Sequence, residues 1–147
     1  MEKTRILTMQ DISCVGRCSI TVALPIISAC GVEASILPSA VLSTHVGFEG
    51  PFCRDLTYDI EDIYKHWLKE KVEFSALYTG YLANKKQIEY VIDIMNSGLI
   101  CNGSSIVVLL WQITASFTAV LIWSMSKRCT GFVNMRISYF PILPRLH

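Results

Sequence analysis

The sequence contains no acidic residue after Asp93. All 12 Asp and Glu residues come at or before that point, whereas basic residues continue to the end of the chain. The charged side chains beyond Asp93 are those of Lys127, Arg128, Arg136 and Arg145. This absence excludes a carboxylate base or an acidic metal site in residues 94–147. One globular domain rarely changes composition so abruptly, and this break near residue 100 predicts that the chain consists of two unlike segments.

Charge of either sign is also scarce. Charged residues make up 17% of the 147 residues and hydrophobic residues 52%, against a usual charged share of about 25%. This composition excludes a disordered tail and a basic nucleic-acid-binding segment, and we expect no nucleic-acid partner. The net charge of +1 gives no electrostatic indication of any other partner. The length is that of about one ordinary domain.

Zinc-site spacing and a signal peptide are missing as well. Cys14 and Cys18 form a C-x3-C pair, but no second pair and no histidine stand at zinc spacing. The start of the chain has no signal-peptide core or cleavage site. We therefore expect a cytoplasmic protein, no metal, and six free thiols in a reducing compartment.

Short apolar runs alternate with segments of helical periodicity. Strands are predicted at Arg5–Gln10, Glu33–Pro38 and Phe74–Tyr78. Helices are predicted at Ser19–Cys30, Leu56–Val72 and Lys85–Met95. Gly31 is a natural helix stop, and Pro25 predicts a kink or an early break in the first helix. The alternation indicates an α/β fold with an open, mostly parallel sheet.

Polar segments follow the predicted strands at Asp11–Gly16, at Ser43–Gly50 within a predicted loop over Ser39–Asp55, and at Thr79–Tyr81. In open parallel sheets, ligands bind outside the carboxyl ends of the strands. The order of elements therefore predicts a small-molecule pocket that these polar segments line.

Three stretches carry a family resemblance: ILTMQDISCVGRCS at Ile6–Ser19, LPSAVLSTHVGF at Leu37–Phe48 and YTGYLANKKQIEYVIDI at Tyr78–Ile94. Taken in order, they resemble pyridoxal and pyridoxamine kinases of the ribokinase-like superfamily. The resemblance covers residues 4–107, so we expect residues 1–107 to be the N-terminal part of such a domain and residues 108–147 to be an aberrant tail. It implies a truncated ribokinase-like (Rossmann-like) α/β fold, a parallel sheet with flanking helices. It also implies phosphorylation of the 5′-hydroxymethyl group of a vitamin B6 vitamer, with ATP and Mg²⁺, in family members that form homodimers.

The same resemblance implies a substrate site made of Asp11, Ser13, His45, Val46 and Tyr81. Asp11 or Ser13 would meet the polar groups of the ring, and Tyr81 would line its flat face. His45 falls on the family's Ser-x-His-Thr loop, where Val46 replaces the threonine and removes a hydroxyl. Structural alternatives stay open: Asp11 can cap the next helix, His45 can order its loop, and Tyr81 can pack.

The parts of the family that move the phosphate come later in its chain. They are an acidic D-P segment, an N-x-x-E metal motif and a G-x-G-D loop, and none of them occurs here. The resemblance therefore gives no catalytic, ATP-binding or metal residue, and we expect this polypeptide to be inactive. Three other readings stay open: a hydroxymethylpyrimidine kinase relative, a non-catalytic ligand-binding module, and a single-span membrane protein with a cytosolic α/β head.

The membrane alternative rests on Ser105–Met125, an uncharged run followed by Lys127 and Arg128. A base missing from the coding DNA near codon 108 explains the run differently. The shifted frame permits D-P-A-M-A-D-N-G from Val108 and A-D-I-I-L-P-N-I-T-E-A-A over Met135–His147, which resembles kinase sequence. We therefore expect residues 108–147 to be read out of frame, and to be poorly determined or incidentally helical, with accidental membrane association.

Overall fold

The computed structural model describes the backbone of residues 4–100, 105–114 and 117–125, and the side chains of residues 4–100. Its helices are α1 (Ile20–Ala29), α2 (Thr57–Lys69) and α3 (Lys85–Asn96). Its strands are β1 (Arg5–Val15), β2 (Glu33–Thr44), β3 (Cys53–Asp55), β4 (Ala76–Thr79), β5 (Ser105–Thr114) and β6 (Phe117–Met125). Each helix and each strand predicted above is present, with shifted ends.

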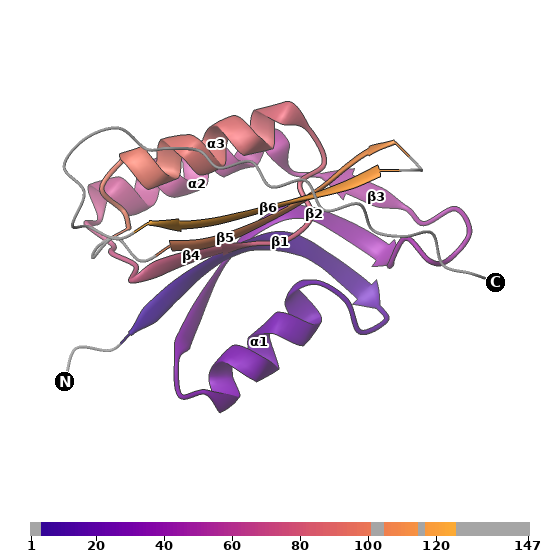
Figure 1. Cartoon of the computed structure of the whole chain (residues 1–147), viewed down its shortest axis with the longest axis horizontal. Helices are drawn as coiled ribbons and strands as arrows, with labels where there is room; N and C mark the ends of the chain where they lie inside the picture. The colour runs from indigo at the N-terminus through magenta and orange to yellow at the C-terminus, as the bar shows by residue number, and fades with distance from the viewer. Residues whose placement is uncertain (1–3, 101–104, 115–116, 126–147) are drawn as a thin grey trace.

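Strand β1 lies inside a four-stranded sheet of order β3-β2-β1-β4 (Figure 1). It pairs in parallel with β2 from Arg5 to Val15, and in parallel with β4 from Ile6 to Met9. The short edge strand β3 pairs antiparallel with β2. The predicted α/β fold with a mostly parallel sheet is therefore confirmed, with one antiparallel strand added at its edge.

Two strands are longer than the sequence pattern predicted. β1 continues through Asp11 to Val15, and β2 continues to Thr44. The prediction of loops over Asp11–Gly16 and Ser39–Asp55 was therefore wrong for these parts. Pairing between β1 and β2 gives the backbone groups of this polar sequence their hydrogen bonds, and such pairing does not depend on apolar side chains.

Helix α1 covers one face of the sheet, while α2 and α3 cover the other (Figure 1). The main core forms on the α2–α3 side. Its fully buried aliphatic members include Leu7, Met9, Leu37, Ile60, Leu77 and Ile94. Burial of each such side chain contributes about 1.5–3 kcal/mol. Because both α2 and α3 contribute buried side chains to this core, their apolar faces hold them on the sheet.

Helix α1 does not break at its proline. It continues through Pro25 to Ala29, so the expected early break was wrong. The predicted stop is confirmed, because the helix ends before Gly31, whose φ of +73° suits glycine.

The apolar run after α3 forms strands instead of a helix. β5 and β6 pair antiparallel, from Ser105 with Met125 to Thr114 with Phe117, and β5 lies beside β4. Val, Ile, Thr and Trp recur in this run and favour strands. Of the two expectations for residues 108–147, the incidental helix is therefore wrong over both strands. In the part of the chain that the structure describes, no helix is long and apolar enough to cross a membrane. Residues 126–147 lie outside the described residues.

Candidate functional site

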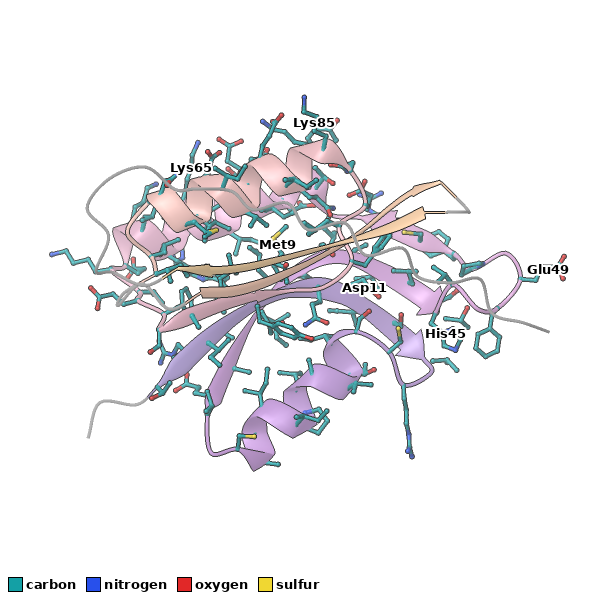
Figure 2. All side chains as sticks on the ribbon, viewed as in Figure 1. Met9, Asp11, His45, Glu49, Lys65 and Lys85 are labelled. Carbon is teal, nitrogen blue, oxygen red and sulfur yellow. The ribbon has the colours of Figure 1, made fainter. Side chains whose placement is uncertain are left out.

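Strands β1, β2 and β4 run parallel, so their carboxyl ends lie at the same end of the sheet. This end is called the carboxyl edge, as distinct from the side on which the edge strand β3 lies. Asp11 and Ser13 lie in the last part of β1, His45 follows β2 directly, and Tyr81 comes shortly after β4. Figure 2 shows Asp11 and His45 toward this edge. The fold thus brings the sequence-predicted residues to the edge where ligands bind in open α/β sheets.

The Asp11 carboxylate is held by two hydroxyl groups. Ser13 Oγ donates to Asp11 Oδ2 at 3.0 Å, and Ser19 Oγ donates to Asp11 Oδ1 at 2.5 Å. Asp11 and Ser13 are almost fully buried. A carboxylate oxygen accepts more than one hydrogen bond, so both oxygens keep acceptor capacity for a ligand. The carboxylate does not cap α1 directly, since its hydrogen-bond partners are the hydroxyl groups of Ser13 and Ser19 and not backbone N–H groups.

Ser19 is a site residue that the sequence reasoning missed. It precedes α1, where a serine usually caps the helix through its side chain. Here Ser19 makes no side-chain cap bond, and its φ is +52°, in the left-handed region that non-glycine residues seldom adopt. Its hydroxyl bonds Asp11 instead. A serine before a helix is visible in the sequence, but it predicts a helix cap. The hydrogen bond of Ser19 to Asp11 depends on tertiary structure and could not be predicted.

His45 joins the ends of β1 and β2. Its backbone N–H donates to the Val15 carbonyl at 3.3 Å. Its ring Nδ1 accepts from the Gly47 backbone N–H at 3.0 Å, and the Phe48 ring lies edge-on to the imidazole at 4.8 Å between centroids. The next residue, Val46, is 73% exposed. The loop therefore fixes the imidazole and leaves the valine side chain in solvent.

Tyr81 is held through its backbone. Ser39 Oγ donates to the Tyr81 carbonyl at 3.4 Å, and the N–H of Gly80 donates to the Met9 carbonyl at 3.0 Å. A Cβ on Gly80 would lie 2.9 Å from Cγ of Gln10, so a larger residue here would have to displace the Gln10 side chain. The Tyr81 residue keeps 37% of its surface exposed. The residue is thus not fully buried in the core.

A buried polar network behind Tyr81 was not predicted. Gln87 is fully buried, and its amide donates to the Ser39 carbonyl at 3.1 Å and to Thr57 Oγ1 at 2.9 Å. Its Oε1 accepts from the Ala83 backbone N–H at 2.9 Å. Asn84 caps α3 by accepting from the Gln87 backbone N–H at 3.0 Å. Together these bonds fix the segment between β4 and α3, which carries Tyr81.

A local signal for this network was present in the sequence. Asn84 and Gln87 have the spacing of a capping box, in which a polar N-cap is followed three positions later by Glu or Gln. The spacing indicates a helix start, which the structure confirms at Lys85. It does not reveal that the glutamine also reaches β2, because that contact depends on how distant segments pack.

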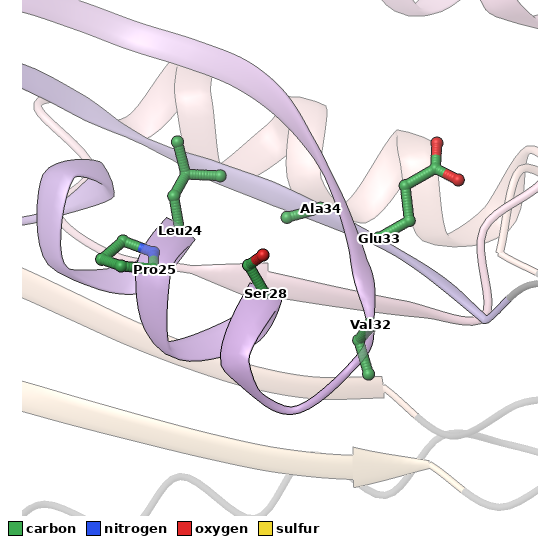
Figure 3. A pocket seen from close by; sticks show the side chains of 6 residues that line it. All are labelled: Leu24, Pro25, Ser28, Val32, Glu33 and Ala34. Carbon is green, nitrogen blue, oxygen red and sulfur yellow. The ribbon is translucent and has the colours of Figure 1, made fainter.

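A hollow of about 470 Å³ lies elsewhere, between α1 and the beginning of β2 (Figure 3). Its lining is mainly aliphatic and consists of Leu24, Pro25, Ser28, Val32, Glu33 and Ala34. Glu33 is engaged with Arg5, whose Nε lies 2.8 Å from Oε1. The hollow is at the amino end of β2, away from the strand ends that carry the predicted residues.

The described side chains do not form a site for Mg²⁺. Among them, the His, Cys, Asp and Glu side chains form no group of three or more that could hold a metal ion. The cysteines with described side chains, Cys14, Cys18, Cys30 and Cys53, are free thiols, as predicted for these four. The side chains of residues 4–100 therefore give no cluster that fits the metal that the family resemblance implies.

Comparison with solved structures relates this geometry to known enzymes. A Bacteroides thetaiotaomicron protein described as a phosphomethylpyrimidine kinase, in a crystal form with pyridoxal, is 37% identical to the chain with a TM-score of 0.67. Pyridoxal kinase from Lactobacillus plantarum is 24% identical, with a TM-score of 0.62. Each match covers 74% of this chain and 37% of the other protein. Pyridoxal kinase from Leishmania donovani, in complex with ADP and pyridoxine, has 16% identity and a TM-score of 0.54, over 63% of this chain and 35% of that one.

The chain has the ribokinase-like fold. It spans somewhat more than a third of the length of these relatives. No protein-family model and no curated protein sequence matches the chain. The ribokinase-like fold that the three sequence stretches predicted is therefore confirmed.

Proposed function

We propose that the chain is the ring-binding part of a vitamin B6 kinase. The observation that carries this proposal is the 37% identity, over 74% of the chain, to a protein crystallised with pyridoxal. The strand-end geometry supports it, because a buried carboxylate, a fixed imidazole and a partly exposed tyrosine lie near the carboxyl ends of β1, β2 and β4, where open α/β sheets bind ligands.

Each side chain has a role that suits a flat, polar heteroaromatic ring. Asp11, with Ser13 beside it, accepts hydrogen bonds from the ring's polar groups. Tyr81 presents an aromatic surface to the ring. His45 contributes a ring nitrogen, and Val46 stands where the family has a threonine. These residues bind and orient the ligand, and none of them is assigned a step in phosphoryl transfer.

The complete reaction of such a kinase is ATP-dependent phosphorylation of the 5′-hydroxymethyl group. The Leishmania donovani neighbour was solved with ADP, which supports nucleotide use by the larger fold. The described residues of this chain do not fit Mg²⁺, and no acid follows Asp93. We therefore propose that residues 1–147 bind a B6 vitamer in the cytoplasm without turning over ATP. Homodimer formation, which the resemblance implies, is a further proposal.

A second candidate is a hydroxymethylpyrimidine kinase relative. The description of the Bacteroides thetaiotaomicron protein as a phosphomethylpyrimidine kinase favours it. The pyridoxal in that crystal form favours the vitamin B6 assignment instead. Both ligands are flat rings with a hydroxymethyl group, so only relative affinity separates the two candidates.

The test is calorimetric titration of the 147-residue chain with pyridoxal, pyridoxamine, pyridoxine and hydroxymethylpyrimidine, followed by an ATP-turnover assay. We expect a B6 vitamer to bind more tightly than the pyrimidine, and no ATP turnover. Tighter pyrimidine binding would establish the second candidate. Binding of none of the four would refute the ring-binding assignment, and turnover would refute the proposed inactivity.

A further inference from the structure

Two glycines enclose the ring of His45. A Cβ on Gly16 would lie 2.3 Å from Cδ2 of the imidazole, and a Cβ on Gly47 would lie 2.7 Å from Cε1 and 2.9 Å from Nδ1. Real Cβ atoms do not approach other atoms this closely, so any larger residue would displace the ring. Gly16 also has a φ of +103°, which disfavours side chains, whereas Gly47 lies outside the left-handed region.

The same loop fixes which nitrogen carries the proton. Gly47 donates its backbone N–H to Nδ1 at 3.0 Å. A backbone N–H can only donate, so Nδ1 must present its lone pair, and the neutral imidazole then carries its hydrogen on Nε2. Phe48 packs edge-on to the ring and limits its rotation. In residues 4–100, none of the hydrogen bonds that the structure shows uses Nε2 of His45.

We propose that Gly16 and Gly47 are positioning residues that hold His45 as an Nε2–H donor toward the ligand. The proposal rests on the proposed function, in which His45 faces a vitamin B6 ring. The donor selects an acceptor on that ring, such as a hydroxyl, phenolate or aldehyde oxygen. Gly47 acts on the ligand only through the imidazole, and this property distinguishes it from a residue that merely shapes the loop.

The decisive variant is Gly47→Ala, because its backbone conformation accepts alanine and only the imidazole obstructs the new methyl group. Gly50→Ala is the matched control in the same loop. A Cβ there meets nothing within 4 Å, although φ is +61°. The control thus includes backbone strain without contact with the ring. Gly16→Ala, compared with the same control, tests the other side of the imidazole.

The first readout is the ¹⁵N NMR signature of the His45 ring in the free chain. We expect an unprotonated Nδ1 and a protonated Nε2 in the wild type and in Gly50→Ala, and loss of this pattern in Gly47→Ala. A wild-type ring that carries its hydrogen on Nδ1 would overturn the proposal. This readout needs no ligand, so it separates the ring-positioning proposal from the proposed function.

The second readout is pyridoxal affinity in a double-mutant cycle. We expect Gly47→Ala to weaken binding roughly tenfold, the value of about one hydrogen bond, and to have little further effect in a His45→Leu background. His45→Gln, which keeps a side-chain N–H donor, should bind better than His45→Leu. Equal losses from Gly47→Ala with and without His45 would overturn the positioning role. If pyridoxal fails to bind the wild type while its ring signature is as expected, the proposed function fails and the glycine enclosure stands.

Discussion

The side-chain amide of Gln87 on α3 donates to the backbone carbonyl of Ser39 on β2, across 48 positions of the sequence. The hydroxyl of Ser39 in turn donates to the carbonyl of Tyr81. One buried glutamine thus connects a helix start, a strand and the segment that carries a candidate ligand-binding tyrosine. The local order of the candidate site therefore depends on a residue that cannot itself contact the ligand.

Replacing Gln87 with leucine should lower the free energy of unfolding by about 1–3 kcal/mol. The leucine fills similar space but leaves the Ala83 N–H, which now donates to the glutamine oxygen, without that partner. Urea denaturation measures the change. Lys85→Ala, an exposed change in the first turn of the same helix, is the control and should stay within about 0.5 kcal/mol of the wild type. Equal stability of the two variants would contradict the assigned role.

Tyr81→Ala should weaken pyridoxal binding about 2- to 13-fold, because an aromatic contact contributes about 0.5–1.5 kcal/mol. Tyr81→Phe keeps the ring and should bind like the wild type. Tyr58→Ala is a matched control, since Tyr58 is 88% exposed and lies on α2. Calorimetric titration measures all three. Unchanged affinity in Tyr81→Ala would show that the tyrosine does not line the ligand.

Val46→Thr should raise pyridoxal affinity. The family resemblance implies a threonine at this position, and one restored hydrogen bond of about 0.5–1.5 kcal/mol corresponds to about 2- to 13-fold. Val46 is largely exposed, so the hydroxyl should cost no folding stability. Val32→Thr, beside the hollow at the other end of β2, repeats the chemical change away from the site. The idea fails if both variants bind pyridoxal as the wild type does.

The sequence predicted those features that depend on local pattern. Helical spacing located α2 and α3, and Gly31 marked the end of α1. The ends of the strands were harder to predict from the sequence. Strand β1 continues through the polar residue Asp11, because it pairs with β2, and this pairing is a long-range property. The partners of Asp11 and Gln87 could not be predicted for the same reason. The membrane-span alternative for Ser105–Met125 rested on uniform hydrophobicity, which does not distinguish a helix from a strand.

The stability of the chain should fall at high pH through Tyr90. This phenol is buried, and it donates to Glu61 Oε2 at 3.1 Å. Burial, and then the hydrogen bond to Glu61, raise the pKa of Tyr90 above its ordinary value of 10.0. The phenol therefore ionises first in the unfolded chain. Its contribution is complete below pH 10 and is lost as the pH rises from there through the folded-state pKa.

Urea denaturation between about pH 8 and pH 11 measures this dependence. Tyr90→Phe should flatten the decline, although part of it should remain because burial also raises the pKa of Tyr64. Tyr58→Phe, at an exposed position, should leave the wild-type curve unchanged. An identical decline in Tyr90→Phe and the wild type would show that Tyr90 is not its source.

Restoring one base near codon 108 should convert the chain into an active kinase. The shifted frame permits a D-P segment from Val108 and an N-x-x-E motif over Met135–His147, and it returns the acids that are missing after Asp93. Phosphoryl transfer needs such acids to hold a metal ion and to orient the nucleophile.

Resequencing the source DNA across codons 100–150 and onward shows whether the base is present there. Expression of the frame-restored gene then tests the chemistry, with the 147-residue chain as the matched control. We expect pyridoxal-dependent ATP turnover only from the restored protein. A restored protein that binds pyridoxal without turnover would refute the reading-frame hypothesis. The ring-binding proposal would remain intact.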